Sequence, residues 1–292
     1  MTGTLPMEEI LFTKMHGAGN DYIYINCLAS VPADPSQLSV EISDRHTGAG
    51  ADGLILIMPS GVADFRMRMF NADGSEGKMC GNASRCIAKY VHDYGLTDRL
   101  TVTLETLSGV RTLVMHPEAD GTVERVTVDM GKPEFTASAV PVTCAGEQMI
   151  DSPVSTAVGE LRLTAVSMGN PHGVIFIDRS PMDFEVEGVG RELECHPMWP
   201  ERANIEFARV TGPDEIEMRV WERGSGETMA CGTGACATAA AARRLGLVSG
   251  DVTVRLCGGD LRISVDDATG HMMMTGPAVT VMEGRYFRKN KD

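Results

Sequence analysis

The chain has 292 residues, of which 43% are hydrophobic and 23% charged, as is typical of a folded globular protein. This length exceeds that of most single compact domains, so we expect two lobes. A formal net charge of -14 repels nucleic acid and anionic membrane surfaces. We therefore expect no nucleic acid and no membrane partner, and a small zwitterionic molecule as ligand.

The N-terminal residues MTGTLPMEEI lack the basic region and apolar stretch of a secretory signal. The longest apolar run, Leu54 to Met58, is far too short to cross a bilayer. We therefore expect a cytoplasmic protein. Since a chain of this length can bury a real core, its eight cysteines are expected to be reduced thiols instead of a disulfide framework.

Alternation of apolar and polar residues predicts strands in two groups, each of which flanks one helical segment. The first group comprises strands at 65–70, 101–106 and 123–130, and its helix is expected at 80–94. The second comprises strands at 215–222, 252–256 and 261–266, and its helix is expected at 231–245. Short connections that contain Gly or Asp predict mainly antiparallel pairing. The predicted fold class is α+β.

The two helical segments are the clearest part of an internal repeat. CGNASRCIAKYVHDYGL begins at Cys80 and CGTGACATAAAARRLGL begins at Cys231, an offset of 151 residues. The Gly-Asn pairs that end at Asn20 and Asn170 are offset by 150 residues. Because such matches keep their order and spacing, a duplication explains them better than chance.

Each copy of the repeat is expected to form one of two pseudo-symmetric lobes. The first lobe is predicted to comprise 1–130 plus 277–292, and the second 131–276. A last strand, at 279–286, follows the second copy, so we expect the chain to return there and complete the first lobe.

Each copy also places a cysteine after a Gly-rich turn, at the start of a helix. Free N–H groups and the dipole at a helix N-terminus favour an anion, so the pKa of such a thiol is expected to fall. The same N–H groups can hold a carboxylate, and Gly81 and Gly232 permit its close approach. Asn82 and Thr233 add polar side chains beside the turns.

Two such thiols, Cys80 and Cys231, suit the inversion of a carbon acid. One thiolate removes the α-proton from one face, and the other thiol returns a proton to the opposite face. Neither a zinc-knuckle spacing, nor a lysine in a pyridoxal phosphate context, nor a convincing nucleotide loop is found, so we expect no metal and no cofactor. The other cysteines are expected to be small buried hydrophobic residues: Cys27, Cys86, Cys144, Cys195, Cys236 and Cys257.

The chain resembles the diaminopimelate epimerase family from Phe12 to about Gly284, and seven motifs carry the resemblance. They are KMHGAGND, DRHTGAGADG, FNADGSE, MCGN, MGNPH, WERGSGET and ACGTGA, in that order. The resemblance implies two lobes, each a mainly antiparallel β-structure around a central helix, with the substrate between them. It implies cofactor-independent interconversion of LL- and meso-2,6-diaminoheptanedioate, in lysine and peptidoglycan precursor biosynthesis. A homodimer is left open, because the sequence does not determine the oligomeric state.

The resemblance also implies roles for single residues. Cys80 and Cys231 are the acid/base pair, while Glu222 and His172 support the reacting end. Arg223 clamps the distal carboxylate, for which a two-pronged guanidinium is well suited. Glu222 also counts among the implied substrate contacts, which otherwise are Asn20, Asn71, Gly81, Asn82, Asn170, Asn204, Gly232 and Thr233. Some relatives carry a substrate-binding glutamine where Gly53 stands here, so that contact is absent or supplied by the backbone.

Three other classes of protein share part of this pattern. A proline racemase or hydroxyproline epimerase shares the fold and the thiol pair, but usually has His at the position of Asn82 and an Asp-x-Ser-Pro stretch directly before the second cysteine, and this chain has neither at those places. A phenazine-pathway isomerase shares the fold but lacks the paired thiols. A thiol-based redox or metal-binding protein would also keep cysteines at helix starts, and sensitivity to chelators would distinguish it.

Overall fold

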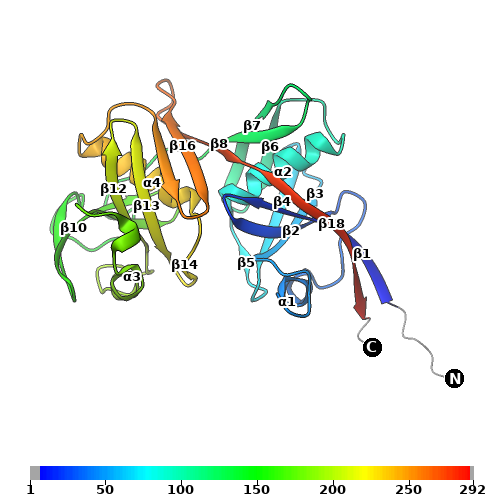
Figure 1. The fold of residues 1–292 in the computed structure, drawn as a ribbon, viewed down its shortest axis with the longest axis horizontal. Helices are drawn as coiled ribbons and strands as arrows, with labels where there is room; N and C mark the ends of the chain where they lie inside the picture. Colours follow the sequence, from blue (N-terminus) through cyan, green and yellow to red (C-terminus); the bar gives the residue numbers. More distant parts are fainter. Residues whose placement is uncertain (1–6, 290–292) are drawn as a thin grey trace. The chain divides into compact units, whose positions relative to one another are not determined.

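The computed structural model describes residues 7–289, and the chain divides into two compact units (Figure 1). Unit 1 comprises Met1–Val126 and Ala278–Asp292, and unit 2 comprises Thr127–Pro277. The sequence-based boundaries are 130/131 and 276/277, and those of the units are 126/127 and 277/278. The residues 1–6 and 290–292 of the predicted first lobe lie outside the described residues.

Unit 1 surrounds a central helix, α2 (Gly81–Asp93), with strands, and α1 (Pro35–Ser43) lies beside β3 and β4 (Figure 1). Its strands are β1 (Met7–Gly17), β2 (Asn20–Asn26), β3 (Gly53–Met58), β4 (Phe65–Asn71), β5 (Glu76–Gly77), β6 (Thr101–Thr106), β7 (Gly109–Pro117) and β18 (Val279–Lys289). The pairs β2–β3 and β4–β6 are parallel, whereas β1–β2, β3–β4, β4–β5, β6–β7 and β1–β18 are antiparallel. The last strand, β18, therefore pairs with the first strand, β1, within unit 1.

Unit 2 repeats this plan around α4 (Gly232–Arg244), with α3 (Val186–Glu194) and the short 3-10 helix η1 (Pro181–Asp183) on its β12–β13 hairpin. Its strands are β9 (Ser152–Thr156), β10 (Gly159–Ser167), β11 (Pro171–Phe176), β12 (Asn204–Gly212), β13 (Glu215–Glu222), β14 (Gly226–Glu227), β15 (Val252–Leu256), β16 (Gly259–Val265) and β17 (Met272–Pro277), while β8 (Val123–Asp129) crosses from unit 1. The pairs β11–β12 and β13–β15 are parallel and correspond to β2–β3 and β4–β6. The α+β class and the mainly antiparallel pairing are confirmed.

The two central helices end in the same way. Gly95 and Gly246 both adopt a left-handed backbone, with φ of 67° and 72°. The following amides, of Leu96 and Leu247, donate to carbonyls of the last helical turn at 2.8 and 2.9 Å. Such a C-terminal motif favours glycine, because a side chain strains this conformation. The repeat inferred from sequence thus extends to the backbone.

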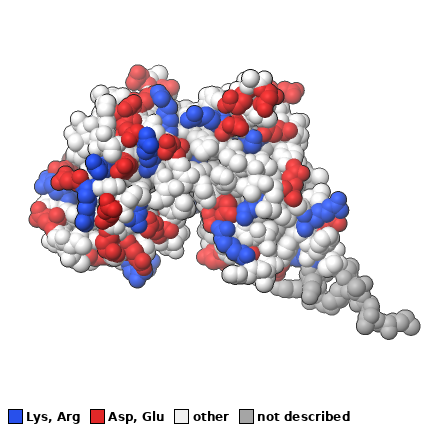
Figure 2. All heavy atoms as spheres, viewed as in Figure 1, with Lys and Arg blue, Asp and Glu red and all other residues white. Residues whose placement is uncertain are grey.

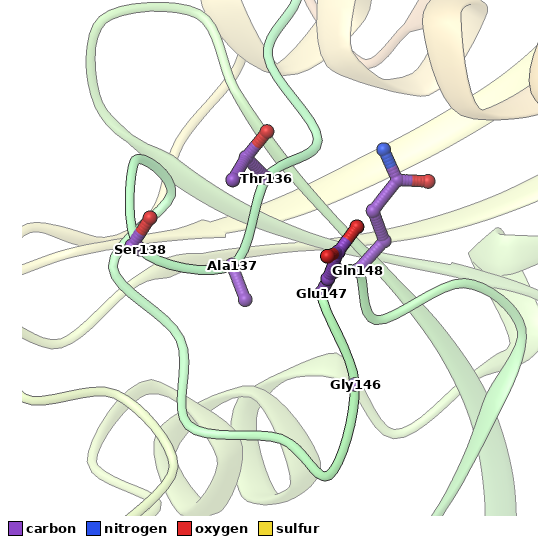
Figure 3. Close-up of a pocket in the computed structure, with 6 residues that line it drawn as sticks. All are labelled: Thr136, Ala137, Ser138, Gly146, Glu147 and Gln148. Carbon is purple, nitrogen blue, oxygen red and sulfur yellow. The ribbon is translucent and has the colours of Figure 1, made fainter.

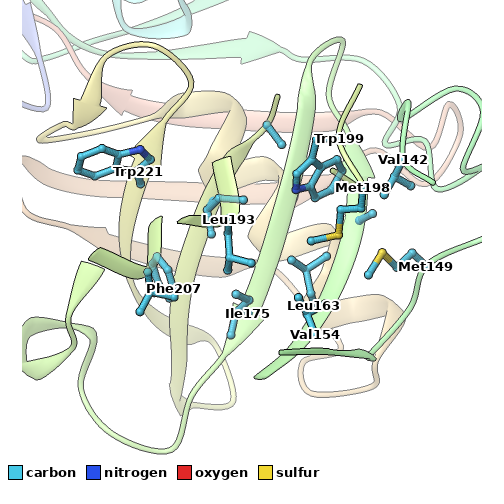
Figure 4. Close-up of a cluster of buried hydrophobic side chains, with 14 of the residues drawn as sticks. Val142, Met149, Val154, Leu163, Ile175, Leu193, Met198, Trp199, Phe207 and Trp221 are labelled. Carbon is cyan, nitrogen blue, oxygen red and sulfur yellow. The ribbon is translucent and has the colours of Figure 1, made fainter. Parts of the chain in front are cut away.

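A hydrophobic core in unit 2 supports the strands that carry the predicted site residues (Figure 4). Leu163, Ile175 and Phe207 extend into it from β10, β11 and β12, and all three are fully buried. Each such side chain contributes about 1.5–3 kcal/mol on burial. Close packing of this kind holds β11, β12 and β13 in a fixed register, so side chains at their ends have fixed positions.

Charged residues of both signs are interspersed on the surface of each unit that Figure 2 shows. None of the helices within the described residues is long and apolar enough to cross a membrane.

Candidate functional site

In unit 1, Cys80 is the residue that caps the N-terminus of α2. Its backbone is extended, with φ -135° and ψ 120°, and the helix proper begins at Gly81. The side chain is partly buried, and its Sγ donates to Oδ1 of Asn20 at 3.4 Å. The predicted placement of a thiol at a helix N-terminus is therefore found, and the thiol lies beside the first amides of the helix.

A chain of polar contacts fixes the amides around Cys80. Oδ1 of Asn20 also accepts from Nδ2 of Asn82 at 3.2 Å, and Oδ1 of Asn82 accepts from Nη2 of the buried Arg85 at 2.8 Å. At the other end, Nδ2 of Asn20 donates to Oδ2 of Asp52 at 2.8 Å. Because a cation and an anion terminate the chain, each amide has one favoured orientation.

Asn71 and Gly53 lie opposite each other across β3 and β4. The Asn71 side chain donates to Oγ of Ser75 at 2.9 Å, within the turn that follows β4, so its contact here is to that turn and its substrate role stays a prediction. A Cβ atom at Gly53 would lie 2.1 Å from the carbonyl oxygen of Phe70. A side chain at this position therefore requires the β3 and β4 backbones to move apart.

In unit 2, Cys231 caps α4 with a similar backbone, φ -118° and ψ 111°. It is more buried than its counterpart, with 5% of its surface exposed. Its Sγ accepts from the backbone N–H of Gly234 at 3.4 Å and lies 3.4 Å from Oγ1 of Thr233. Gly232 supplies the first helical residue, as Gly81 does in unit 1.

Burial raises the pKa of the Cys231 thiol well above its usual value, and the carboxylates of Glu222 and Glu206 raise it further. The Thr233 hydroxyl and the Gly234 N–H lower it, but by less. Burial likewise raises the pKa of Glu222, against the opposing effects of the Thr228 hydroxyl and the Cys231 thiol. The predicted lowering of the thiol pKa is wrong for Cys231, because desolvation and two acidic neighbours outweigh the helix N-terminus.

His172 and Asn170 connect β11 with the Cys231 turn. The fully buried His172 ring lies with Nε2 3.0 Å from Oδ1 of Asn170 and with Nδ1 2.6 Å from Oε1 of Glu206. Nδ2 of Asn170 donates to Oγ1 of Thr233 at 3.4 Å. The structure thus brings these predicted residues together and adds Glu206, which the sequence interpretation missed. The sequence does contain a sign of this residue, because Glu206 is a single acidic residue within the apolar first half of β12.

Asn204 and Arg223 form a second group at the ends of β12 and β13. Oδ1 of Asn204 accepts from the Arg223 backbone N–H at 3.0 Å, and its Nδ2 donates to the carbonyl of Pro171 at 3.0 Å. Nη1 of Arg223 donates to the carbonyl of Glu201 at 3.0 Å. Asn204 therefore ties the turn that carries Glu222 and Arg223 to the start of β11.

The diaminopimelate epimerase family model matches residues 12–136 and 164–281. The curated diaminopimelate epimerase of Acetivibrio thermocellus is 49% identical over 273 residues, which cover 94% of this chain and 97% of that protein. The chain is a member of the diaminopimelate epimerase family. The diaminopimelate epimerase of Phocaeicola vulgatus is 51% identical over 275 residues, covering 94% of this chain and 97% of its own.

Solved structures with this fold have a lower sequence identity to this family member. A hydroxyproline epimerase from Agrobacterium vitis superimposes with a TM-score of 0.70 at 16% identity, covering 97% of this chain and 93% of its own. A phenazine biosynthesis protein from Bacillus anthracis gives a TM-score of 0.68 at 17% identity, covering 96% and 99%. At these identities the likeness concerns the fold alone.

The remaining cysteines of this diaminopimelate epimerase family member only partly follow expectation. Cys27, Cys86 and Cys236 are buried, and burial raises the pKa of Cys27 and of Cys86 to about 11. Cys195 and Cys257 are exposed, so their prediction as buried residues is wrong. Cys195 directly follows the helix α3, and Cys257 directly follows the strand β15, where the chain reaches the surface. Cys144 is partly buried.

A separate hollow of about 480 Å³ lies on the loops that follow β8 in unit 2 (Figure 3). It contains none of the predicted site residues and is lined by Thr136, Ala137, Ser138, Gly146, Glu147 and Gln148. Within the described residues, no group of three or more His, Cys, Asp or Glu side chains is arranged to hold a metal ion.

Proposed function

We propose that this chain interconverts LL- and meso-2,6-diaminoheptanedioate with two cysteines, Cys80 and Cys231, as the acid/base pair. The observation that carries the proposal is the repeated placement of a thiol at a helix N-terminus, once in each unit of a diaminopimelate epimerase family member. Metabolically, this reaction belongs to lysine and peptidoglycan precursor biosynthesis.

The proposed mechanism transfers one proton on each face of the α-carbon. A thiolate takes the α-proton, and the electron pair left behind is delocalised into the substrate carboxylate. The opposite thiol then donates its proton to the carbon, so that one thiol and one thiolate are present before and after the reaction. The raised pKa of Cys231 keeps it protonated in the free chain, which suits it to donate.

The helix N-termini are proposed to bind the reacting carboxylate. Backbone amides at Gly81-Asn82 and Gly232-Thr233 precede any intrahelical acceptor, so they favour the negative charge that grows during proton removal. The side chains of His172 and Glu222 support this reacting end from unit 2. No cofactor takes part in this proposal, because the thiols and amides supply the acid, the base and the anion binding.

The other end of the substrate requires recognition without reaction. Arg223 is proposed to bind the distal carboxylate, since its guanidinium is held near the strand end by one bond to Glu201 and keeps further donors. Neutral amides are proposed to bind the amine and carboxylate groups without adding charge: Asn20, Asn71, Asn82, Asn170 and Asn204.

We also propose a cytoplasmic homodimer whose ligand is the small-molecule substrate alone. Met7, Leu11 and Phe287 share one face of the antiparallel β1–β18 pair and are 57%, 64% and 54% exposed, so this face offers apolar area for a second copy. Sedimentation equilibrium of the full chain tests the oligomeric state, and a monomer mass contradicts it.

Isotope exchange tests the proposed reaction directly. In deuterated solvent, diaminopimelate is expected to gain deuterium at the α-position as its configuration inverts, and proline is expected to remain unchanged. Cys80→Ala and Cys231→Ala should each reduce epimerisation by at least about 10³-fold, because the acid and base of a two-base reaction cannot replace one another. Activity that survives either substitution, or that chelators abolish, contradicts the proposal.

A further inference from the structure

Glu206 is a fully buried carboxylate close to the proposed site. It lies on β12 between two core residues, Ile205 and Phe207, and its side chain has no exposed surface. Oε1 is 2.6 Å from Nδ1 of His172, whereas Oε2 is buried without a hydrogen-bond partner among the described residues. Burying a carboxylate with one oxygen unsatisfied is unfavourable, so its presence needs a reason.

The internal repeat shows that the fold itself does not need this carboxylate. In unit 2 the parallel register places Val174 opposite Glu206, and in unit 1 it places Tyr24 opposite Ile55. Ile55 precedes Glu206 by the repeat offset of 151 residues and is also fully buried. An apolar side chain therefore fills the same place in the other copy.

The contacts of His172 suggest what the carboxylate does. Nε2 faces the amide oxygen of Asn170, and because an amide oxygen accepts, this orientation of the amide pairs with a hydrogen on Nε2. Two arrangements of the His172–Glu206 contact allow a hydrogen on Nε2. In one, a doubly protonated ring donates from Nδ1–H to ionised Glu206. In the other, protonated Glu206 donates to Nδ1 of a neutral ring. In both arrangements the carboxyl group on the Nδ1 side is compatible with a proton on Nε2.

We propose that Glu206 is a positioning residue that holds His172 with a proton on Nε2 and thereby sets the orientation of the Asn170 amide. With its oxygen bound by His172, Asn170 turns its nitrogen toward Thr233 and the Cys231 turn. There it presents a donor to a carboxylate, so the inference rests on the proposed function of that turn. Gly234 makes room for the arrangement, because a Cβ there would lie 2.7 Å from Oε1 of Glu206.

Glu206→Gln tests the proposal with little change of shape. Its amide can either donate to Nδ1 or accept from it, so His172 is free to lose the Nε2 proton and the Asn170 amide to reverse. We expect kcat/KM for diaminopimelate to fall about 10–100-fold, the usual cost of losing a side chain that orients a site residue, and KM to rise. Nitrogen-15 spectra, with His172 assigned by comparison with His172→Gln, should show protonated Nε2 in the wild type and an added Nδ1–H tautomer in the variant.

Two further variants separate positioning from stability. Glu206→Ile introduces the residue of the first copy and is expected to fold but to be at least as impaired as Glu206→Gln. Glu215→Gln removes a carboxylate that pairs with Arg255 at 2.5 Å at the far end of β13, and its kinetics should match the wild type. An unchanged kcat/KM in Glu206→Gln, or a wild-type His172 without a proton on Nε2, overturns the inference. A wild type that fails to epimerise diaminopimelate refutes the proposed function instead, and the nitrogen-15 result still decides the tautomer.

Discussion

The two thiols occupy copies of one turn, yet their surroundings differ in charge. The repeat offset relates Asn71 to Glu222 and Ile55 to Glu206, so the two carboxylates near Cys231 correspond to uncharged residues in the first copy. Cys80 instead donates to a neutral amide oxygen. The duplicated backbone therefore supplies the position of each thiol, and a few side chains give the two thiols different neighbours.

Glu222→Gln is expected to lower the pKa of Cys231. The Glu222 carboxylate raises that pKa by repelling the thiolate, so its removal should allow the thiolate to form at lower pH. The ultraviolet absorbance of the thiolate, taken as the difference between chains with and without Cys231→Ser, gives the titration midpoint. A midpoint equal to or above that of the wild type would show that Glu222 does not act on the thiol in this way.

At the residue scale, the sequence predicted the site best where a motif carried the signal. The cysteines, the Gly turns and Asn170 were found in the expected local settings. Glu206 was missed, since a single acidic residue in an apolar run has no spacing that distinguishes it. The raised pKa of Cys231 was missed too, because the depth of burial depends on residues distant in sequence.

At the scale of elements, strands were predictable where one face alone is buried. β4, β6, β13 and β15 alternate in burial and match the predicted ranges closely. β11 and the first half of β12 are buried on both faces and pair in parallel, so they show no alternation. The helix α1 also went unpredicted, although Asp34 caps it through Gln37 and Pro35 opens it, which are both readable signals.

Gly53→Ala is expected to destabilise the β3–β4 pair. The added Cβ would lie 2.1 Å from the carbonyl oxygen of Phe70, so the two strands must move apart. We expect a loss of about 1–3 kcal/mol in the free energy of unfolding, as for other overpacked sites, measured by urea denaturation. Gly61→Ala is the matched control, because a Cβ there meets no atom within 4 Å. Equal stabilities of the two variants would contradict the close approach.

At the scale of the whole molecule, the two units differ in how they use the ends of the chain. Unit 1 contains both the N-terminal and the C-terminal segment, whereas unit 2 contains neither. Unit 2 is one continuous segment, Thr127–Pro277, with its own core. Unit 1 is discontinuous and includes β18, which pairs with β1 along most of its length. Tyr286 from β18 packs against the core cluster of unit 1 that contains Ile10 and Ile23.

A chain that ends at Pro277 should therefore lose structure in unit 1 alone. Without β18, the β1 backbone loses its partners on one side and the core loses Tyr286, whereas every strand pair from β9 to β17 keeps its partner. Hydrogen exchange measured by mass spectrometry should show faster exchange in β1 and β2 and near wild-type protection in β10, β12 and α4. If unit 1 of the shortened chain kept its protection from hydrogen exchange, β18 would not be needed for the fold of unit 1. Loss of protection in both units would mean instead that unit 2 does not hold its fold independently of unit 1.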